Sequence, residues 1–426
     1  MSEVRRRELA DASSVGAVAR EVRPPAVAPD IAGVVRDIIR EVRDRGDAAL
    51  VDDARRFGAP GFTAARLRVA PEACAEAARA LPPDLRTAID MAAGQVRALA
   101  RATLPQDRDV DMPAGQRITV RSVPVAAAGC YVPGGRAAYP SSLIMAVVPA
   151  QEAGVPRVAV ASPAGPDGAP HPVIMATAHL LGVEELYAVG GAAAVAALAY
   201  GTHTIPPVAV ITGPGSSWVQ EAKRQVTDTV GIDGFAGPSE VVVIADATAS
   251  PRGIALDLLA QAEHGPDSFA VLATHDPAVI DAVADAIAAE GTPVGAVTLV
   301  RCADPELSLA LAEEIAPEHL EVCTADADAL VARVTRAGAV FVGPHCATAY
   351  GDYVAGSNHV LPTGGAARFA SALGTSTYLR RMSVVHMTDA AVRELTPHLL
   401  AIAEAEGFTM HAASAAARLE TTEGPA

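Results

Sequence analysis

Apolar residues along this chain follow two spacings that alternate in two long regions. Between residues 125 and 215, and again between 240 and 343, short continuous apolar runs are separated by stretches with helical spacing. A continuous apolar run predicts a strand buried on both faces, and the intervening helices predict parallel pairing. The pattern therefore predicts an α/β fold with two doubly wound parallel-sheet (incomplete Rossmann-like) domains. Their ligands are expected at the carboxyl ends of the strands.

The first part of the chain predicts an irregular opening followed by helices. Helical spacing from Ile31 to Val42, with Asp30 as N-cap and Gly46 as terminator, predicts an amphipathic packing helix. A second helical stretch covers about 83–104. Residues 117–125 then change to the two-residue alternation of a strand.

The last part of the chain predicts a helical tail. Two helical runs, about 388–405 and 408–420, are parted by Gly407. Glu406 and His411 flank this glycine and lie five apart, so they can share a site only if the helix breaks there. The tail helices carry apolar residues that need a packing partner: Leu400, Ile402, Phe408 and Met410.

Composition and charge exclude several classes of protein. The chain has 426 residues, 50% hydrophobic and 19% charged, which is typical of a globular protein. A net charge of -16 and the lack of a basic face exclude nonspecific nucleic-acid binding. No apolar stretch is long enough to span a membrane, and no signal peptide is recognised. Five scattered cysteines indicate reduced thiols, and a cytoplasmic protein is expected.

The segment QAEHGPD presents two metal-ligand types at the end of a predicted helix. That helix covers 251–264, with Ser250 as N-cap and a Gly-Pro pair that forbids continuation. Gln261 and His264 are three residues apart, so they lie on one face of the last turn. The alternative interpretation is a histidine that interacts with the helix dipole, beside a surface glutamine.

Two glycine-containing loops each follow a predicted strand and precede a helix. The loops cover 130–142 and 213–217, and their layout suits an anionic group such as a pyrophosphate at a helix N-terminus. Neither loop matches the GxGxxG fingerprint, and such turns need glycine for steric reasons alone. Cys130 in the first loop is a candidate thiol nucleophile, with a small buried hydrophobe as the alternative.

Two further polar segments are candidates for chemistry. Glu318 and His319 follow a proline at an element terminus, where adjacent residues point to different sides and suit two separate proton transfers. A capping glutamate beside an ordinary histidine is the alternative. The long loop 351–365 contains Asp352 as a candidate metal ligand and His359 as a candidate substrate anchor. A structural Ω-loop is the competing interpretation.

Taken together, these motifs resemble one known family. The segments GCYVPGGRAAYPSS, GPG, EAKRQV, IDGFAGPSEV, QAEHGPDS, APEHLEV and GDYVAGSNHVLPTGG occur in the order found in histidinol dehydrogenases. The resemblance covers nearly the whole chain. It implies a zinc enzyme that oxidises L-histidinol to L-histidinal and then to L-histidine, with two NAD molecules used in succession.

The resemblance also implies roles for individual residues. The implied zinc ligands are Gln261, His264, Asp352 and His411, and the implied acid/base pair is Glu318 and His319. Implied substrate contacts are Ser239, His359 and Glu406, together with Gln261, His264, Glu318, Asp352 and His411. Positions implied to contact NAD are Tyr131, Ala193 and Ser216.

The sequence departs from the family pattern at two of the cofactor positions. Ala193 stands where the family usually has Gln, and Ser216 stands where it usually has Asn. The implied NAD contacts are therefore fewer than usual. One alternative is a paralogue that oxidises another amino alcohol or a diol with altered cofactor binding. A zinc hydrolase and a catalytically silent binding protein are further alternatives.

The resemblance and the alternation together predict four parts of the chain and a homodimer. The parts are an N-terminal extension (1–25), a discontinuous large α/β domain (26–129 and 239–373), a second, NAD-associated α/β domain (130–238) and a helical tail (374–426). The tail is expected to be exchanged between two subunits, so that His411 of one completes the site of the other.

Overall fold

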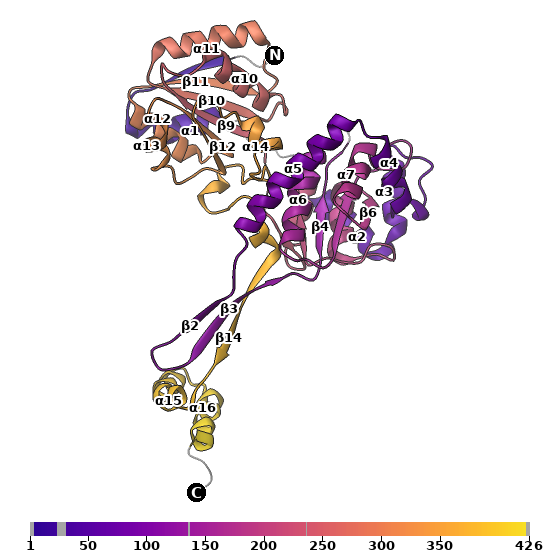
Figure 1. Cartoon of the computed structure of the whole chain (residues 1–426), viewed down its shortest axis with the longest axis vertical. Coiled ribbons are helices and arrows are strands. Elements are labelled where there is room, and N and C mark those ends of the chain that lie inside the picture. Colours follow the sequence, from indigo (N-terminus) through magenta and orange to yellow (C-terminus); the bar gives the residue numbers. More distant parts are fainter. Residues whose placement is uncertain (1–3, 24–30, 135–136, 236, 423–426) are drawn as a thin grey trace. The chain divides into compact units, whose positions relative to one another are not determined.

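Chain segments far apart in sequence form two compact units. The computed structural model describes residues 4–23, 31–134, 137–235 and 237–422. One unit combines Met1–Thr103 with Ala126–Tyr378, and the other combines Leu104–Val125 with Leu379–Ala426. Both can be followed in Figure 1. Short 3-10 helices lie at Ala12–Ser14, Ala64–Arg66, Ala366–Arg368 and Thr375–Tyr378.

The first unit contains a six-stranded parallel sheet with helices on both faces. Its order is β1-β11-β10-β9-β12-β13, formed by β1 (Val4–Leu9), β9 (Glu240–Ala245), β10 (Phe269–Thr274), β11 (Ala296–Cys302), β12 (His319–Cys323) and β13 (Ala339–Val342). Successive strand side chains point to opposite faces, so Val242 packs with one set of helices and Val243 with the other. One face carries α1 (Val15–Val22), α12 (Pro305–Ile315) and α13 (Ala327–Val331); the other carries α10 (Pro251–Ala262) and α11 (Pro277–Glu290).

A five-stranded parallel sheet forms the second core of the same unit. Its order is β6-β5-β4-β7-β8, formed by β4 (Ala128–Tyr131), β5 (Val158–Ser162), β6 (Glu185–Ala188), β7 (Val210–Thr212) and β8 (Gly231–Ile232). The connecting helices are α6 (Pro140–Glu152), α7 (Pro172–Leu180), α8 (Gly191–Tyr200) and α9 (Ser217–Gln225). In both sheets the strand order reverses at an interior strand, which confirms the predicted pair of doubly wound domains.

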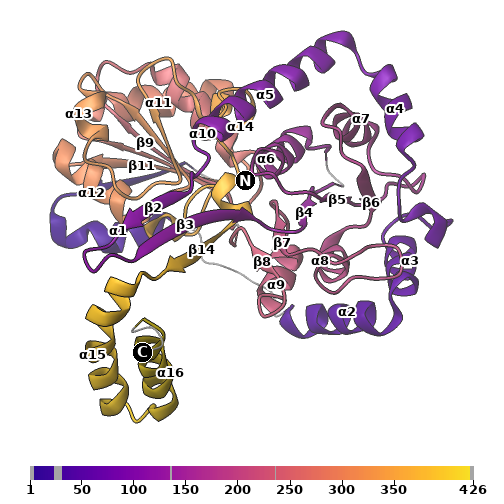
Figure 2. The same ribbon diagram turned by 60° about the horizontal axis from the view of Figure 1, so that its bottom comes forward.

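The N-terminal helices pack on this second core. They are α2 (Ala32–Arg45), α3 (Asp47–Arg56), α4 (Pro71–Ala80) and α5 (Pro83–Ala102). Helix α2 contacts α8 and α9, α4 contacts α7, and α5 contacts α6; Figure 2 shows α2 and α3 beside α8 and α9. The prediction grouped these helices with the domain of residues 239–373. The observed packing differs because helical periodicity shows that a helix has a buried face but not which sheet covers it.

The predicted boundaries of the early elements hold, and one strand was missed. Helix α2 ends at Arg45, and Gly46 follows with a φ of 56°. The predicted cap Asp30 lies outside the described residues. The expected irregular opening contains β1, an edge strand that pairs with β11. Its sequence VRRREL has no apolar alternation that would predict a strand. Most of its side chains are at least partly exposed, and Arg6 pairs with Asp281.

The second unit joins a three-stranded antiparallel sheet to two helices. The sheet order is β14-β3-β2, formed by β2 (Arg108–Asp111), β3 (Arg117–Pro124) and β14 (Leu379–His386). The helices are α15 (Asp389–Ala405) and α16 (Thr409–Thr422), as predicted, with Gly407 at a φ of 75° between them. Strand β14 was not predicted, because its side chains are largely exposed and show no apolar alternation.

None of the described helices is both long enough and apolar enough to cross a membrane.

Candidate active site

The end of α10 places Gln261 and His264 as predicted, with one small difference. The Ser250 hydroxyl accepts a hydrogen bond from Gly253 N at 3.3 Å, which caps the helix. Gln261 lies in the last turn and is 2% exposed, whereas His264 lies just beyond the helix and is exposed. Its Nδ1 lies 3.2 Å from the Ala260 carbonyl oxygen. Because a carbonyl only accepts, Nδ1 carries the proton and the Nε2 lone pair is free to bind a ligand.

These residues lie at the amino edge of the six-stranded sheet, not at the predicted carboxyl edge. Glu240 and His319 are the first residues of β9 and β12. Helix α10 follows β9 and runs back past it, so its last turn returns to the edge where the strands begin. The candidate residues of this sheet therefore do not follow the expectation of a carboxyl-edge site, because they stand at the starts of β9 and β12 and at the end of α10, which all lie at the amino edge.

Glu318 and His319 face one small buried volume. Glu318 Oε2 accepts a hydrogen bond from Glu240 N at 2.9 Å and lies 3.4 Å from Gln261 Nε2. His319 Nδ1 lies 3.2 Å from the Glu240 carbonyl oxygen, to which it donates. The expected separation of the two side chains was wrong, since Glu318 Oε2 and His319 Nδ1 are 3.5 Å apart. Glu318 precedes the strand and so does not follow its alternation.

The Nε2 atom of His319 points at Asp352. The His319 Nε2–Asp352 Oδ1 distance is 3.5 Å, and Nε2 is buried without a hydrogen bond from the described residues. Burial lowers the pKa of His319, but the carboxylates of Asp352 and Glu318 outweigh burial and raise that pKa to about 10. The site therefore stabilises a positive charge on this imidazole.

The Asp352 carboxylate interacts electrostatically with three histidines. It lies on the short helix α14 (Thr348–Tyr353), not in a loop as predicted. Burial raises the pKa of Asp352, but His319, His359 and His264 together lower it below its usual range. Such a carboxylate remains ionised and is suited to a cation.

His359 connects this site to the second sheet through a residue that was not singled out from the sequence. Its Nδ1 donates to the Asp352 carbonyl oxygen at 2.8 Å, so its Nε2 accepts the Ser142 hydroxyl at 3.2 Å. Burial lowers the pKa of His359, which keeps the ring neutral. Ser142 is in the first turn of α6, beyond the carboxyl end of β4, and it closes the glycine loop 130–142. The position of Ser142 at the end of that loop was the only feature of the sequence that could have indicated its role.

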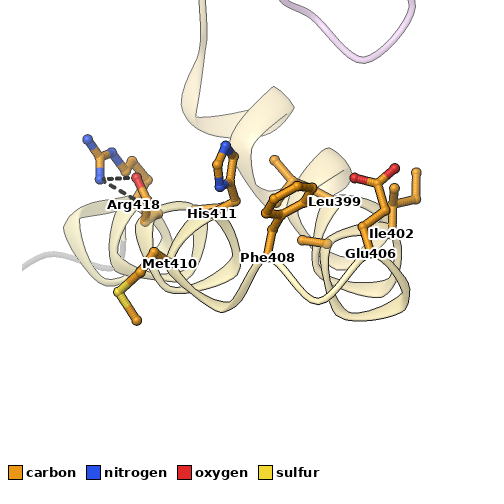
Figure 3. Close-up of a pocket in the computed structure, with 10 residues that line it drawn as sticks. Leu399, Ile402, Glu406, Phe408, Met410, His411 and Arg418 are labelled. Atoms are coloured by element: carbon orange, nitrogen blue, oxygen red, sulfur yellow. Dashed lines mark hydrogen bonds between the residues drawn. The ribbon is translucent and has the colours of Figure 1, made fainter.

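Of the three other implied substrate contacts, one adjoins this site and two lie in the second unit. Ser239 is half-buried directly before β9, and its carbonyl oxygen accepts from Phe269 N at 3.1 Å. Glu406 and His411 belong to the second unit, where they line one hollow of the α15–α16 hairpin (Figure 3). The condition that the helix must break at Gly407 for them to share a site is met. The same hollow carries four exposed apolar side chains: Leu399, Ile402, Phe408 and Met410.

Two of the three implied cofactor positions line one cavity. Ala193 and Ser216 lie on a cavity of about 350 Å³ at the carboxyl edge of the five-stranded sheet. Tyr131 is buried beside it, and its hydroxyl accepts from Gly191 N at 3.2 Å. Cys130 is buried on the same strand, and burial raises its pKa to about 12, which favours the interpretation as a small hydrophobe over a nucleophile.

The donor chemistry of the first unit fits a divalent metal ion. Within the described residues no group of three or more His, Cys, Asp and Glu side chains forms a metal site. The implied set has only His264 and Asp352 of these types in this unit, with an amide from Gln261. The fit rests on the His264 ring, because a metal-binding histidine usually donates its other N–H to a carbonyl or carboxylate.

A buried carboxyl pair lies behind the site. Glu321 on β12 is fully buried; its Oε1 accepts from Thr348 N at 2.8 Å, at the start of the helix that carries Asp352. Its Oε2 has no hydrogen-bond partner in the described part of the chain and faces Asp257 of α10. Burial and Asp257 raise the pKa of Glu321 to about 8, and burial raises that of Asp257 to about 6. Burial opposes ionisation of both carboxyl groups, and for Glu321 the charge of Asp257 adds to it, so the pair retains a proton at pH values where ordinary carboxyl groups are ionised.

We expect Glu321→Gln to remove a pH dependence of stability. The folded state keeps a proton that the unfolded chain loses at its ordinary pKa of 4.5, so stability falls as pH rises from there to about 8. The amide can still accept from Thr348 N and donate to Asp257. Urea unfolding at pH 5.5 and at pH 8.5 gives the unfolding free energy at each pH. The loss of free energy between the two pH values should be smaller in the variant than in the wild type by roughly 2 kcal/mol. Equal pH dependence in both proteins would contradict the retained proton.

Comparison with known proteins identifies the family that this chain resembles. The family model for histidinol dehydrogenase matches residues 22–419. Histidinol dehydrogenase from Rhizobium meliloti (strain 1021) is 47% identical over 410 residues, covering 93% of this chain and 94% of that protein. The corresponding protein from Thermobifida fusca (strain YX) is 44% identical over 405 residues, covering 91% and 92%.

A solved structure agrees with the sequence matches. The crystal structure of histidinol dehydrogenase from Elizabethkingia anophelis has a TM-score of 0.94 and 28% sequence identity, and all of both chains is covered. The family is one of dehydrogenases, which favours an oxidoreductase over the zinc hydrolase and the silent binding protein. This chain belongs to the histidinol dehydrogenase family.

Proposed function

We propose that this protein is a zinc-dependent, NAD-linked dehydrogenase of histidine biosynthesis. It oxidises L-histidinol through L-histidinal to L-histidine in two hydride transfers. The observation that carries the proposal is the buried pair of Glu318 and His319, with His319 Nε2 directed at Asp352 beside Gln261 and His264. An acid/base pair next to a candidate metal site is what the oxidation of a polar alcohol requires.

Three residues of the first unit would hold the metal. His264 offers its free Nε2, and Asp352 offers an ionised carboxylate. Gln261 turns its Nε2 towards Glu318, so its amide oxygen is left as the ligand atom. When bound, the ion supplies positive charge that orients the polar groups of the substrate and favours loss of the alcohol proton.

His319 acts as the base in the alcohol step. Its Nδ1–H is held by the Glu240 carbonyl, so the Nε2 atom is the one that would accept the alcohol proton. NAD, when bound, would supply the hydride acceptor. Asp352 stabilises the imidazolium that forms, at 3.5 Å. A cation held at Asp352 would offset part of the negative charge that holds the proton on His319, and so would favour its action as a base.

Glu318 acts in the aldehyde step. Its Oε2 is fixed by Glu240 N and faces Gln261 Nε2. A carboxylate held in this way takes a proton from water as the oxygen adds to the aldehyde carbon. The hydrate that forms would give its carbon-bound hydrogen as hydride to the second NAD and one hydroxyl proton to a base, which leaves the carboxylic acid.

We also propose that the active site is completed by a second subunit. In the proposed homodimer, His411 from the partner's tail is the fourth metal ligand and Glu406 contacts the substrate. The exposed apolar residues around these two side chains support this arrangement, because they need a covering surface (Figure 3). Ser239 and His359 of the first unit would also contact the substrate.

The direct test is NAD reduction by purified protein with L-histidinol, compared with a panel of other amino alcohols and diols. We expect L-histidinol to yield two NADH per molecule oxidised. Activity on a different alcohol alone would support the paralogue interpretation. No response to any alcohol would sink the dehydrogenase proposal.

Glu318→Gln is expected to slow the second oxidation more than the first. Only the aldehyde step needs an activated water, and loss of a general base typically lowers a rate by about 100-fold to 10,000-fold. The two steps are measured separately, with L-histidinol and with L-histidinal as substrates. Equal losses on both substrates would contradict the role assigned to Glu318.

A further inference from the structure

The cavity that contains Ala193 and Ser216 has one carboxylate and one guanidinium in an otherwise largely apolar wall. Its volume is about 350 Å³, and its lining comes from α2, α3, the segments after β5 and β6, and the first residues of α8 and α9. Apolar walls include Val34, Ile38 and Pro163. The carboxylate is Asp53 of α3. Arg56 of the same helix also lines the cavity, which therefore combines an apolar surface with one carboxylate and one guanidinium.

Asp53 lacks the donors that a buried carboxylate normally has. Among the described residues, no hydrogen bond or ion pair reaches its side chain, although Arg56 is near enough to exert a favourable charge effect. Burial raises the pKa of Asp53 to about 6, against the lowering effect of Arg56. A half-buried carboxylate without donors is costly to the folded protein. A ligand that brings hydroxyl donors into the cavity would remove this cost.

The other residues of the cavity suit the rest of a nucleoside. Trp218 offers an aromatic ring, 38% exposed, on which a base can stack. Ala193 and Ser216 are small, so polar contacts to a sugar must come largely from another residue. Neighbouring hydroxyls of a ribose match the two oxygens of the Asp53 carboxylate, whereas a phosphate in direct contact with that carboxylate would be repelled by it.

We propose that Asp53 binds the ribose diol of the adenosine half of the cofactor and makes this protein select NAD over NADP. The inference rests on the NAD dependence proposed above. It assigns the specificity to a side chain that sequence motifs did not indicate, because the glycine-loop pattern of dinucleotide sites places the acidic residue after a strand and Asp53 lies on a helix.

The chain provides its own reporter for a binding experiment that needs no turnover. Trp218 is the only tryptophan and lines the cavity, so its fluorescence should change when the cavity fills. Titrations with NAD and with NADP, each repeated by calorimetry, give two dissociation constants. For the wild-type protein we expect NAD to bind at least about ten-fold more tightly than NADP, from one set of charge-assisted hydrogen bonds.

Asp53→Asn should weaken NAD binding by roughly ten-fold and tighten NADP binding, since the acceptor loses its charge and the repulsion disappears. The substitution removes an unpaired buried charge, so the thermal midpoint should be unchanged or higher. Asp52→Asn is the matched control, because Asp52 is exposed one residue earlier on the same helix and pairs with Arg45. It should leave both affinities as in wild type.

The outcomes separate this inference from the function on which it rests. A wild-type protein that binds neither nucleotide overturns both. If the wild type binds NAD and the Asp53→Asn variant keeps the same ratio of NAD to NADP affinity, the role of Asp53 is refuted and the dehydrogenase proposal stands.

Discussion

His264→Ala should abolish turnover and leave the fold intact. The His264 side chain is exposed just beyond α10, and its hydrogen bonds within the described residues go to backbone carbonyls of that helix. Exposed substitutions of this kind usually change stability by no more than about 0.5 kcal/mol. The proposed zinc site loses one of its nitrogen ligands, however. We expect kcat/KM of the variant to fall by about 1,000-fold, which corresponds to a loss of about 4 kcal/mol of transition-state stabilisation.

Metal content and activity measured together test this prediction. Bound zinc after dialysis should fall in His264→Ala, and a chelator should inactivate the wild-type protein to a similar extent. His275→Ala is the matched control, since His275 is also exposed but follows β10 at the opposite edge of the same sheet. Full activity in protein verified to be free of metal would refute the proposed role of zinc.

Mixing two inactive variants, His319→Ala and His411→Ala, should restore activity if the tail is exchanged. In a mixed dimer, the first unit with intact His319 receives the intact tail of its partner, so one of the two sites is whole. Random reassortment after reversible dissociation makes about half of the dimers mixed, which predicts roughly a quarter of wild-type activity.

A second mixture controls for recovery by any other route. His319→Ala and His264→Ala both lie in the first unit, so every site of their mixed dimer retains one defect and no activity should return. If the tail acts on its own chain, the His319→Ala and His411→Ala mixture also remains inactive. The two mixtures must therefore differ for the exchanged-tail proposal to survive.

Local pattern was enough to predict most elements of this protein. Continuous apolar runs such as EVVVIA and FAVLAT form strands buried on both faces, because only such strands hide every side chain. Helix ends also follow from local chemistry: the Ser250 hydroxyl caps α10, and Gly46 and Gly407 adopt a positive φ after helices. Local pattern also singled out Gln261, His264, Glu318, His319 and Asp352 as candidates, but only the family resemblance joined them into one site, since no spacing rule links residues 261 and 352.

Strands with mostly exposed side chains were not predictable in this way. Strands β1 and β14 present arginines to solvent and have no alternation of apolar and polar residues. Each is held by pairing with a strand more than a hundred residues away, β11 and β3. Backbone hydrogen bonds to a distant strand do not depend on side-chain identity, so the local sequence does not reveal them.

Only the tertiary structure decided what surrounds each functional side chain. The sequence by itself determined that Glu318, His319 and Asp352 are available, whereas the return of α10 brought Gln261 and His264 to the amino edge beside them. The contacts of His359 with Ser142 and of Glu321 with Thr348, and the unpaired carboxylate of Asp53, likewise join elements far apart in the chain. Protonation and ligand choice depend on burial and on through-space charges, and these are properties of the packed fold that no local pattern contains.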